Sequence, residues 1–199
     1  MVSANNIGIV ILAAGSSSRL SRPKQLLEFD GVTLLSHATI EAANSNACNV
    51  IVVIGAYADL IANEIDGDIV YIVKNENWNE GIASSVRLGL DALLKQTPSI
   101  DAVIFMVCDQ PFVTSSLLND LIAKQRETQK AIVASNYGET IGPPALFHQS
   151  LFAELMELKG DVGARRIIQL HSDEVATVFF PDGKIDIDTQ KDYNVLKKR

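Results

Sequence analysis

Residues 7–24 read IGIVILAAGSSSRLSRPK, an apolar run that passes directly into a loop of small residues followed by cations. Ile7–Leu12 is apolar throughout and rich in β-branched residues, as expected of a strand covered on both faces. The small residues after it let the backbone approach a ligand closely, and successive N–H groups can form a nest for an anion. This stretch therefore predicts a buried strand that ends in a phosphate-binding loop.

The rest of the chain alternates between predicted strands and predicted helices. The strands are expected at Val50–Ile54, Ile69–Val73, Ala102–Val107, Ala131–Ala134 and Val175–Phe179. The helices are expected at Leu34–Ala43, Ser84–Leu94, Ser115–Arg126, Ser150–Leu158 and Val162–Leu170. The alternation predicts an α/β fold with a mainly parallel central sheet, in which ligands bind outside the carboxyl ends of the strands.

Local signals add boundaries to this outline. Three helices are expected to begin at capping residues that can bind their first free N–H groups. These caps are Thr114 or Ser115, Asp161, and Thr189. Thr189 is followed by Asp192, which resembles a capping box. The segment Asn136–Pro144, with its glycines and paired prolines, predicts a long loop.

Composition limits the kinds of partner. The 199 residues fit one domain, taken here as 1–199, with 47% hydrophobic and 21% charged residues. The net charge of −7 offers no basic surface to nucleic acid or to an anionic membrane, so neither is expected as a partner. No signal peptide or membrane span is indicated at the N-terminus. Cys48 and Cys108 are interpreted as reduced, buried thiols, and the protein is expected to be cytoplasmic.

The loop after the first strand fits neither common phosphate motif. A Walker A loop needs a second glycine before a Lys-Ser/Thr pair, and a dinucleotide fingerprint needs G-x-G-x-x-G. Arg19 can grip a phosphate with two hydrogen bonds, and Lys24 adds a point charge. Composition alone leaves a flexible Ser-rich turn with a solvated basic tail as an equal alternative.

The whole string Leu12–Lys24 resembles the signature of the MobA-like nucleotidyltransferases, roughly L-A-A-G-x-S-x-R-M-G-x-P-K. The resemblance implies a Rossmann-like three-layer sandwich of the nucleotide-diphospho-sugar transferase type. It also implies catalytic roles for Arg19 and Lys24. The nucleotide-binding residues that it implies here are Leu12, Ala13, Ala14, Gly15, Ser16, Ser18, Arg19 and Lys24. Leu20-Ser21 replaces the usual Met-Gly, which leaves the geometry of the loop open.

Two acidic segments are candidates for a magnesium site. Asp109 follows the strand Ala102–Val107 directly, where a carboxylate is a natural Mg²⁺ ligand, although a structural cap is the alternative. Cys108–Pro111 resembles the metal-binding aspartate motif of the same family, which implies a catalytic role for Asp109. Asp186 and Asp188 resemble the family's D-[IV]-D-T-P-E-D segment; Asp188 is expected to be the second ligand, with Asp186 as the alternative.

Further motifs resemble the cytidylyltransferase branch of the family. Glu80–Gly89 by itself predicts only a helix start, but its likeness to a G-M-x-S-S segment implies that Gly81, Ser84 and Ser85 bind the nucleotide. Gly142–Phe147 and Gly160–Arg166 resemble strings on the acceptor side, which implies Pro144 and Arg165 as acceptor-binding residues, with Arg166 as the alternative to Arg165. Trp78 is expected either to wall the pocket or to pack.

The resemblance implies transfer of CMP from CTP to a molybdopterin-type cofactor, with Mg²⁺ as cofactor, release of pyrophosphate and a molybdenum hydroxylase as a possible recipient. Ala14 stands where the guanylyl branch has a second glycine, and its side chain favours the smaller pyrimidine. Three alternatives stay open. They are another MobA-like transferase (guanylyl or with a different small phosphorylated acceptor), the cytidylyltransferase of isoprenoid synthesis, and a silent nucleotide- or cofactor-binding chaperone for a molybdoenzyme.

Overall fold

The predicted first strand lies near the middle of a seven-stranded sheet with the order β5-β4-β1-β6-β8-β7-β9 in the computed structural model. The structure describes residues 6–20, 22–65, 67 and 69–198. The strands are β1 (Ile7–Ala13), β4 (Asn49–Ile54), β5 (Tyr71–Lys74), β6 (Ala102–Val107), β7 (Ile132–Asn136), β8 (Ile141–His148) and β9 (Val175–Phe179). Only β8 runs antiparallel to its neighbours β6 and β7, so the predicted mainly parallel sheet is confirmed.

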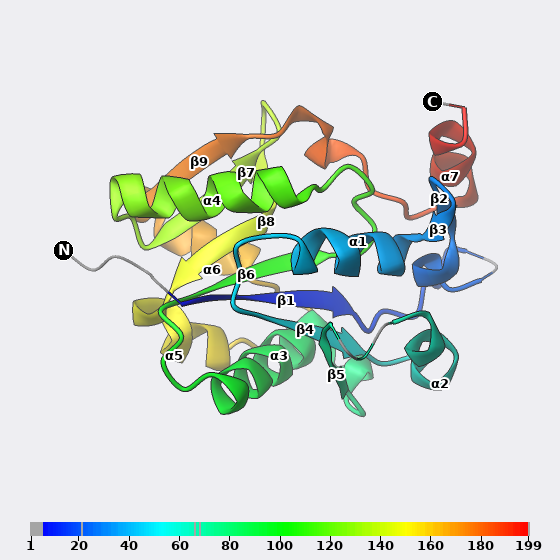
Figure 1. Cartoon of the computed structure of the whole chain (residues 1–199), viewed down its shortest axis with the longest axis horizontal. Coiled ribbons are helices and arrows are strands. Elements are labelled where there is room, and N and C mark those ends of the chain that lie inside the picture. Colours follow the sequence, from blue (N-terminus) through cyan, green and yellow to red (C-terminus); the bar gives the residue numbers. More distant parts are fainter. Residues whose placement is uncertain (1–5, 21, 66, 68, 199) are drawn as a thin grey trace.

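Helices cover both faces of this sheet. They are α1 (Leu34–Ala43), α2 (Ala58–Ile61), α3 (Ile82–Gln96), α4 (Ser115–Thr128), α5 (Phe152–Met156), α6 (Arg165–Leu170) and α7 (Gln190–Leu196). In Figure 1, α1 and α4 lie above the sheet and α3 and α5 lie below it. The result is the expected three-layer sandwich.

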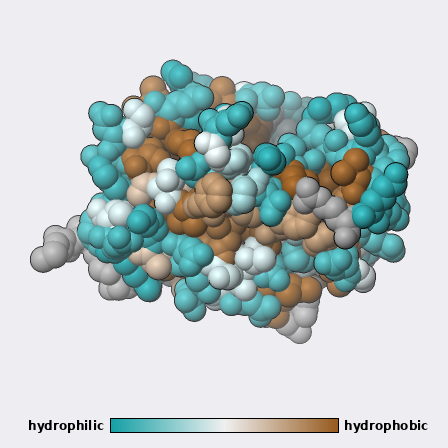
Figure 2. Space-filling view, turned by 90° about the horizontal axis from the view of Figure 1, so that it is seen from above, coloured by the Kyte–Doolittle hydropathy of each residue, from teal (hydrophilic) through white to brown (hydrophobic). Residues whose placement is uncertain are grey.

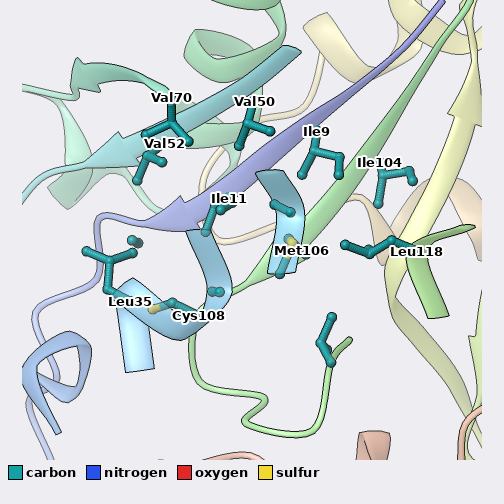
Figure 3. Close-up of a cluster of buried hydrophobic side chains, with 14 of the residues drawn as sticks. Ile9, Ile11, Leu35, Val50, Val52, Val70, Ile104, Met106, Cys108 and Leu118 are labelled. Atoms are coloured by element: carbon teal, nitrogen blue, oxygen red, sulfur yellow. The ribbon is translucent and has the colours of Figure 1, made fainter. Parts of the chain in front are cut away.

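The side chains of β1 alternate between two hydrophobic layers because successive residues of a strand point to opposite faces. Ile9 and Ile11 pack with Leu35 of α1 and Leu118 of α4, as Figure 3 shows. Val10 points to the other face, where it packs in the layer formed with α3, α5 and α6. Being buried on both sides explains why the strand is apolar throughout.

The predicted loop Asn136–Pro144 is partly wrong, because β8 begins within it at Ile141. Proline is usually confined to edge strands or bulges because it cannot donate to the ladder. Here the pairing of β7 with β8 shifts between Ala134, opposite Ala145, and Ser135, opposite Gly142. Pro143 and Pro144 fall inside this irregularity, which lets an inner strand contain both.

Two of the three predicted helix caps are confirmed, and one is wrong. Thr114 accepts a hydrogen bond from Leu117 N–H at the start of α4, and Thr189 forms a capping box with Asp192 at the start of α7, as predicted. The cap at Asp161 is wrong, because α6 begins only at Arg165. Cys108 is buried as expected, but Cys48 is exposed, so the expectation for that thiol is also wrong.

The C-terminal helix brings the end of the chain against its beginning. In Figure 1, α7 stands beside the short hairpin of β2 (Glu28–Phe29) and β3 (Val32–Thr33). The hydroxyl of Tyr193 donates to the Glu28 carbonyl at 3.1 Å and accepts from the Glu28 N–H at 3.2 Å. A small separate core forms here from Leu27, Leu34, Ile187, Tyr193 and Leu196. This contact fixes residues 186–188 close to the first loop.

The outer surface is mixed in polarity. Figure 2 looks onto the face above α1 and α4 and shows hydrophobic residues in its middle, surrounded by hydrophilic ones. Within the described ranges, none of the helices has the length and apolar character that a membrane span requires.

We predict that Gly89→Ala destabilises the protein although alanine is the better helix former. A Cβ at this position in α3 would lie 2.4 Å from Cγ1 of Val10 and 3.0 Å from Cγ2 of Val53, both on stiff β-branched side chains. Overpacking of this kind costs about 1–3 kcal/mol, against a helix-propensity gain of about 1 kcal/mol. Urea denaturation measures the change. Gly163→Ala is the matched control, since its nearest neighbour is 3.4 Å away. Equal stability of Gly89→Ala and the wild type would contradict the close packing.

Candidate nucleotide site

A cleft of about 570 Å³ opens at the carboxyl ends of β1 and β6. After β1 the sheet grows through β4 to β5 on one side of β1, and β6 is then added on the other side. The strands β1 and β6 therefore flank the point where the strand order reverses. The cleft is lined by residues 12–16 after β1, Lys24 and Gln25, residues 78–82 and Ser85 at the start of α3, Val107–Asp109 after β6, and Asp161. Of the predicted nucleotide-binding residues, Leu12, Ala13, Ala14, Gly15, Ser16, Lys24, Gly81 and Ser85 lie in it.

Gln25, which is not among the predicted site residues, holds the loop in shape. Its side-chain amide donates to the carbonyls of Ala13 at 2.8 Å and Gly15 at 3.1 Å, and the residue is 1% exposed. Ser17 donates to the Gln25 amide oxygen at 3.3 Å and accepts the backbone N–H of Lys24 at 2.9 Å. Both loop carbonyls are thus bonded to the amide of Gln25, which fixes the loop backbone.

The serines of the loop differ in role. Ser16 lines the cleft. Ser17 has a positive φ of 51°, and its hydroxyl forms a hydrogen bond within the loop, to the N–H of Lys24. Ser18 and Arg19 do not line the cleft, so the structure does not bring these predicted residues into it. Ser21, where the chain departs from the family signature, lies outside the described residues.

Lys24 brings the two predicted metal ligands together. Its ammonium group contacts a carboxylate oxygen of Asp109 and lies 3.0 Å from Asp188. Asp188 also pairs with Arg19 at 2.7 Å, although the Arg19 side chain is 66% exposed and solvent therefore screens this pair. Asp186 makes no ion pair with any described cation, so the geometry favours Asp188 as the partner of Asp109.

The backbone positions Asp188. The N–H of Ile187 donates to the carbonyl of Asp109 at 3.0 Å, and the Ile187 side chain is fully buried in the core under α7. Because neighbours in an extended segment point to opposite sides, burying Ile187 turns Asp186 and Asp188 outward. This contact joins the end of β6 to a segment almost eighty residues later.

The charges of this cluster shift its protonation. Burial is the largest single effect and acts to lower the pKa of Lys24. The charge and hydrogen bond of Asp109, with smaller contributions from Cys108 and Asp188, together outweigh burial and raise this pKa, so the ammonium stays protonated. Burial also acts to raise the pKa of Asp188, but hydrogen bonding and charge from Lys24, with the charge of Arg19, lower it overall. Burial, then the charges of Asp109 and Asp188, raise the pKa of Asp186. Asp188 is therefore the better anion of the pair.

The cluster fits a divalent cation that is also held by substrate. Asp109 Oδ1 is buried without a hydrogen-bond partner among the described residues, and one cation, Lys24, reaches both Asp109 and Asp188. Within the described ranges no group of three or more His, Cys, Asp or Glu side chains is arranged to hold a metal. Mg²⁺ commonly takes one or two carboxylates and completes its shell with phosphate oxygens and water.

Asn75 organises the start of α3. Its buried amide donates to the hydroxyls of Ser84 at 2.8 Å and Ser85 at 2.9 Å. Ser84 in turn donates to the carbonyls of Asn77 and Gly81, and it does not line the cleft. Ser85 does line the cleft and keeps a hydroxyl hydrogen to donate. Ser84 therefore shapes the turn, and Ser85 is the one of the two that a ligand can reach.

The predicted acceptor residues lie apart from the cleft. Pro144 is buried, and its carbonyl accepts from Ser135 at 2.7 Å. Arg165 is exposed and lines a separate shallow pocket beside β7 and β8. Tyr137 lies between these regions; it accepts from Gln110 at 3.1 Å and donates to the carbonyl of Pro143. Burial raises the pKa of Tyr137 to about 12, so it stays a neutral donor.

Ala14 sits on a closely packed floor. A Cβ on Gly55 would lie 2.8 Å from the side chain of Ala14 and 2.8 Å from that of Trp78, so Gly55 leaves room for both. Trp78 is 37% exposed and lines the cleft. Because Gly55 already lacks a side chain, no smaller residue at this position could let Ala14 lie deeper below the cleft.

Comparison with known proteins decides the family. A model of the MobA-like NTP transferase domain matches residues 9–175, most of the chain and both strand ends of the cleft. The chain belongs to this family. The resemblance inferred from the loop Leu12–Lys24 is thereby confirmed.

Relatives and solved structures agree with this assignment. The purine catabolism protein PucB of Bacillus subtilis is 26% identical over 204 residues, and the match covers 95% of this chain and 95% of that protein. Nicotine blue oxidoreductase of Paenarthrobacter nicotinovorans is 30% identical over 118 residues, which are 59% of this chain and 56% of that protein. The chain spans only 28% of the bifunctional protein GlmU of Thermobifida fusca, at 25% identity. The structure of Rv0371c from Mycobacterium tuberculosis superposes with a TM-score of 0.86 at 29% identity over 100% of both chains.

We predict that Gln25→Glu destabilises the folded protein. The change replaces a buried N–H₂ donor with an oxygen that faces two backbone carbonyls. Leaving buried acceptors unpaired costs about 1–3 kcal/mol, and more if the new carboxylate stays charged. Urea denaturation measures the loss. Gln190→Glu, on an exposed glutamine in the first turn of α7, is the matched control and is expected to be neutral or slightly stabilising because of the helix dipole. Equal stability of Gln25→Glu and the wild type would refute the role of Gln25 in the loop.

Proposed function

We propose that this protein, acting as a single domain over residues 1–199, transfers CMP from CTP to a molybdopterin-type cofactor and releases pyrophosphate. The observation that carries the proposal is the contact of Lys24 with Asp109 and Asp188 at the mouth of the phosphate loop. A protonated ammonium beside an anion-binding loop suits a triphosphate. Two converging carboxylates suit the divalent cation that accompanies it.

The donor is proposed to lie with its phosphates on residues 12–16 and its base toward the start of α3. Loop N–H groups and Lys24 bind and neutralise the phosphates, while Gly81 and Ser85 face the nucleoside. Ala14 and its packed floor favour a pyrimidine over a purine. Arg19, outside the cleft and paired with Asp188, would have to turn inward to reach the leaving group.

The reaction depends more on positioning the acceptor phosphate and the α-phosphate than on an activated side-chain nucleophile. An ionised phosphate of the acceptor attacks the α-phosphorus in line; the new O–P bond forms as the bond to the β-phosphate oxygen breaks, and pyrophosphate leaves. Lys24 stabilises the charge that grows on this leaving group. Asp109 and Asp188 would hold Mg²⁺, which supplies neutralisation of the phosphate oxygens. A structural relative, Rv0371c, has been solved in complex with manganese, which supports a divalent ion here.

The acceptor is proposed from two motifs. Gly142–Phe147 lies on β8, beyond β6, whereas Gly160–Arg166 begins beside the donor cleft, which Asp161 lines, and reaches Arg165 outside it. Gly142–Phe147 and Gly160–Arg166 resemble strings of the molybdenum cofactor cytidylyltransferase branch. Arg165 is exposed and free of described ion pairs, so it can bind an acceptor phosphate, while the buried Pro144 would act only by shaping the strand. A molybdenum hydroxylase in the cytoplasm would then receive the product.

The direct test measures pyrophosphate release with CTP, GTP and ATP in turn, with and without molybdopterin-type cofactor. The proposal predicts release with CTP that depends on both the cofactor and Mg²⁺. Release with GTP instead would support the guanylyl alternative. Binding of nucleotide without turnover under any condition would support a silent chaperone.

We predict that Asp109→Asn and Asp188→Asn each lower the rate of pyrophosphate release by about 100-fold or more, because each removes a charge from the proposed metal site. Asp186→Asn is expected to lose much less, since Asp186 makes no ion pair with Lys24 or any other described cation. Steady-state kinetics with saturating CTP and Mg²⁺ measure all three. A larger loss for Asp186→Asn than for Asp188→Asn would reverse the assignment of the second ligand.

A further inference from the structure

The segment Leu158–Asp161 packs onto the start of α3. The carbonyl of Gly160 accepts the N–H of Ala83 at 3.2 Å, and the carbonyl of Leu158 accepts from the side chain of Arg87. Gly81 makes the approach possible: its φ is +105°, and a Cβ there would lie 2.4 Å from the carbonyl of Gly160 and 2.6 Å from the N–H nitrogen of Asp161. The segment is therefore fixed against the nucleoside end of the proposed donor site.

This packing places Asp161, which is exposed to solvent, in the lining of the cleft. Asp161 was expected to cap a helix, but α6 begins four residues later, so the Asp161 carboxylate does not cap it. Instead it lines the same cleft as Gly81, Ile82 and the loop after β1.

The carboxylate of Asp161 differs from the other acidic groups of the cleft. Asp109 is paired with Lys24, and Glu80 lies 3.6 Å from Arg87. Among the described residues, the Asp161 carboxylate has neither an ion-pair partner nor a hydrogen-bond partner. An unpaired anion in a nucleotide cleft would repel phosphate, so it suits a part of the ligand that carries hydrogen-bond donors.

We propose that Asp161 selects the base of the donor: its carboxylate accepts a hydrogen bond from the exocyclic amino group of a pyrimidine, so that CTP is bound in preference to UTP. The inference rests on the proposed function. A carboxylate only accepts hydrogen bonds, whereas uracil presents a carbonyl oxygen at the position of the cytosine amino group. Asp161 would thus separate CTP from UTP, while Ala14 disfavours the larger purines. Together, Asp161 and Ala14 would select CTP from the four common nucleoside triphosphates.

The test is equilibrium binding of CTP, UTP, dCTP and GTP to the full chain with Mg²⁺, measured by titration calorimetry. The wild type is expected to bind CTP at least about tenfold more tightly than UTP, as a hydrogen bond to a charged group allows. Asp161→Asn, whose amide can also donate to a carbonyl, is expected to lower the ratio of CTP to UTP affinity by about the same factor. Glu157→Gln, an exposed acid-to-amide change shortly before Asp161, is the matched control and should keep the wild-type ratio.

The outcomes separate the inference from the proposed function. If the wild type prefers CTP and Asp161→Asn keeps the full preference, the role of Asp161 is overturned while the donor assignment stands. If the variant instead loses only its preference for CTP over dCTP, Asp161 reads the ribose and the inference is equally overturned. If the wild type binds no nucleotide, or prefers GTP, the proposed donor itself fails. The melting temperature without nucleotide checks that both variants are folded.

Discussion

The contact of Lys24 with Asp109 and Asp188 joins three segments that are far apart in the sequence. Lys24 comes from the loop after β1, Asp109 from the end of β6, and Asp188 from the segment before α7. Opposite charges in a partly buried place attract one another strongly, which the raised pKa of Lys24 and the lowered pKa of Asp188 reflect. The same arrangement offers positive charge to the proposed phosphate and negative charge to the proposed metal ion.

The surrounding architecture keeps these charges in place. Gln25 bonds to the loop carbonyls, and the N–H of Ile187 bonds to the carbonyl of Asp109. The small core around Tyr193 then clamps the C-terminal helix to the first hairpin. Because such fixed groups need little reorganisation when a ligand arrives, the scaffold itself contributes to binding and to stabilisation of developing charge.

Local patterns in the sequence predicted most of the fold. The strand Ile7–Leu12 and the helix Leu34–Ala43 are apparent because burial imposes a periodicity on every residue of an element. The strand β8 was missed because Pro143 and Pro144 normally exclude a strand, and only the bulge opposite Ala134 and Ser135 accommodates them. The family motifs indicated Asp109 and Lys24. No local pattern reveals a contact such as that of Gln25 with Ala13, or that of Gly81 with Gly160, since both depend on how distant or looping segments pack.

In the proposed function, the triphosphate of CTP and a divalent ion meet at Lys24, Asp109 and Asp188. A crystal structure with CTP and Mn²⁺, with an anomalous difference map to locate the metal, tests this arrangement. We expect an anomalous peak coordinated by Asp109 and Asp188, with Lys24 turned to the phosphates and the base between Ala14 and the start of α3. A peak elsewhere, or a triphosphate outside the loop of residues 12–24, would contradict it.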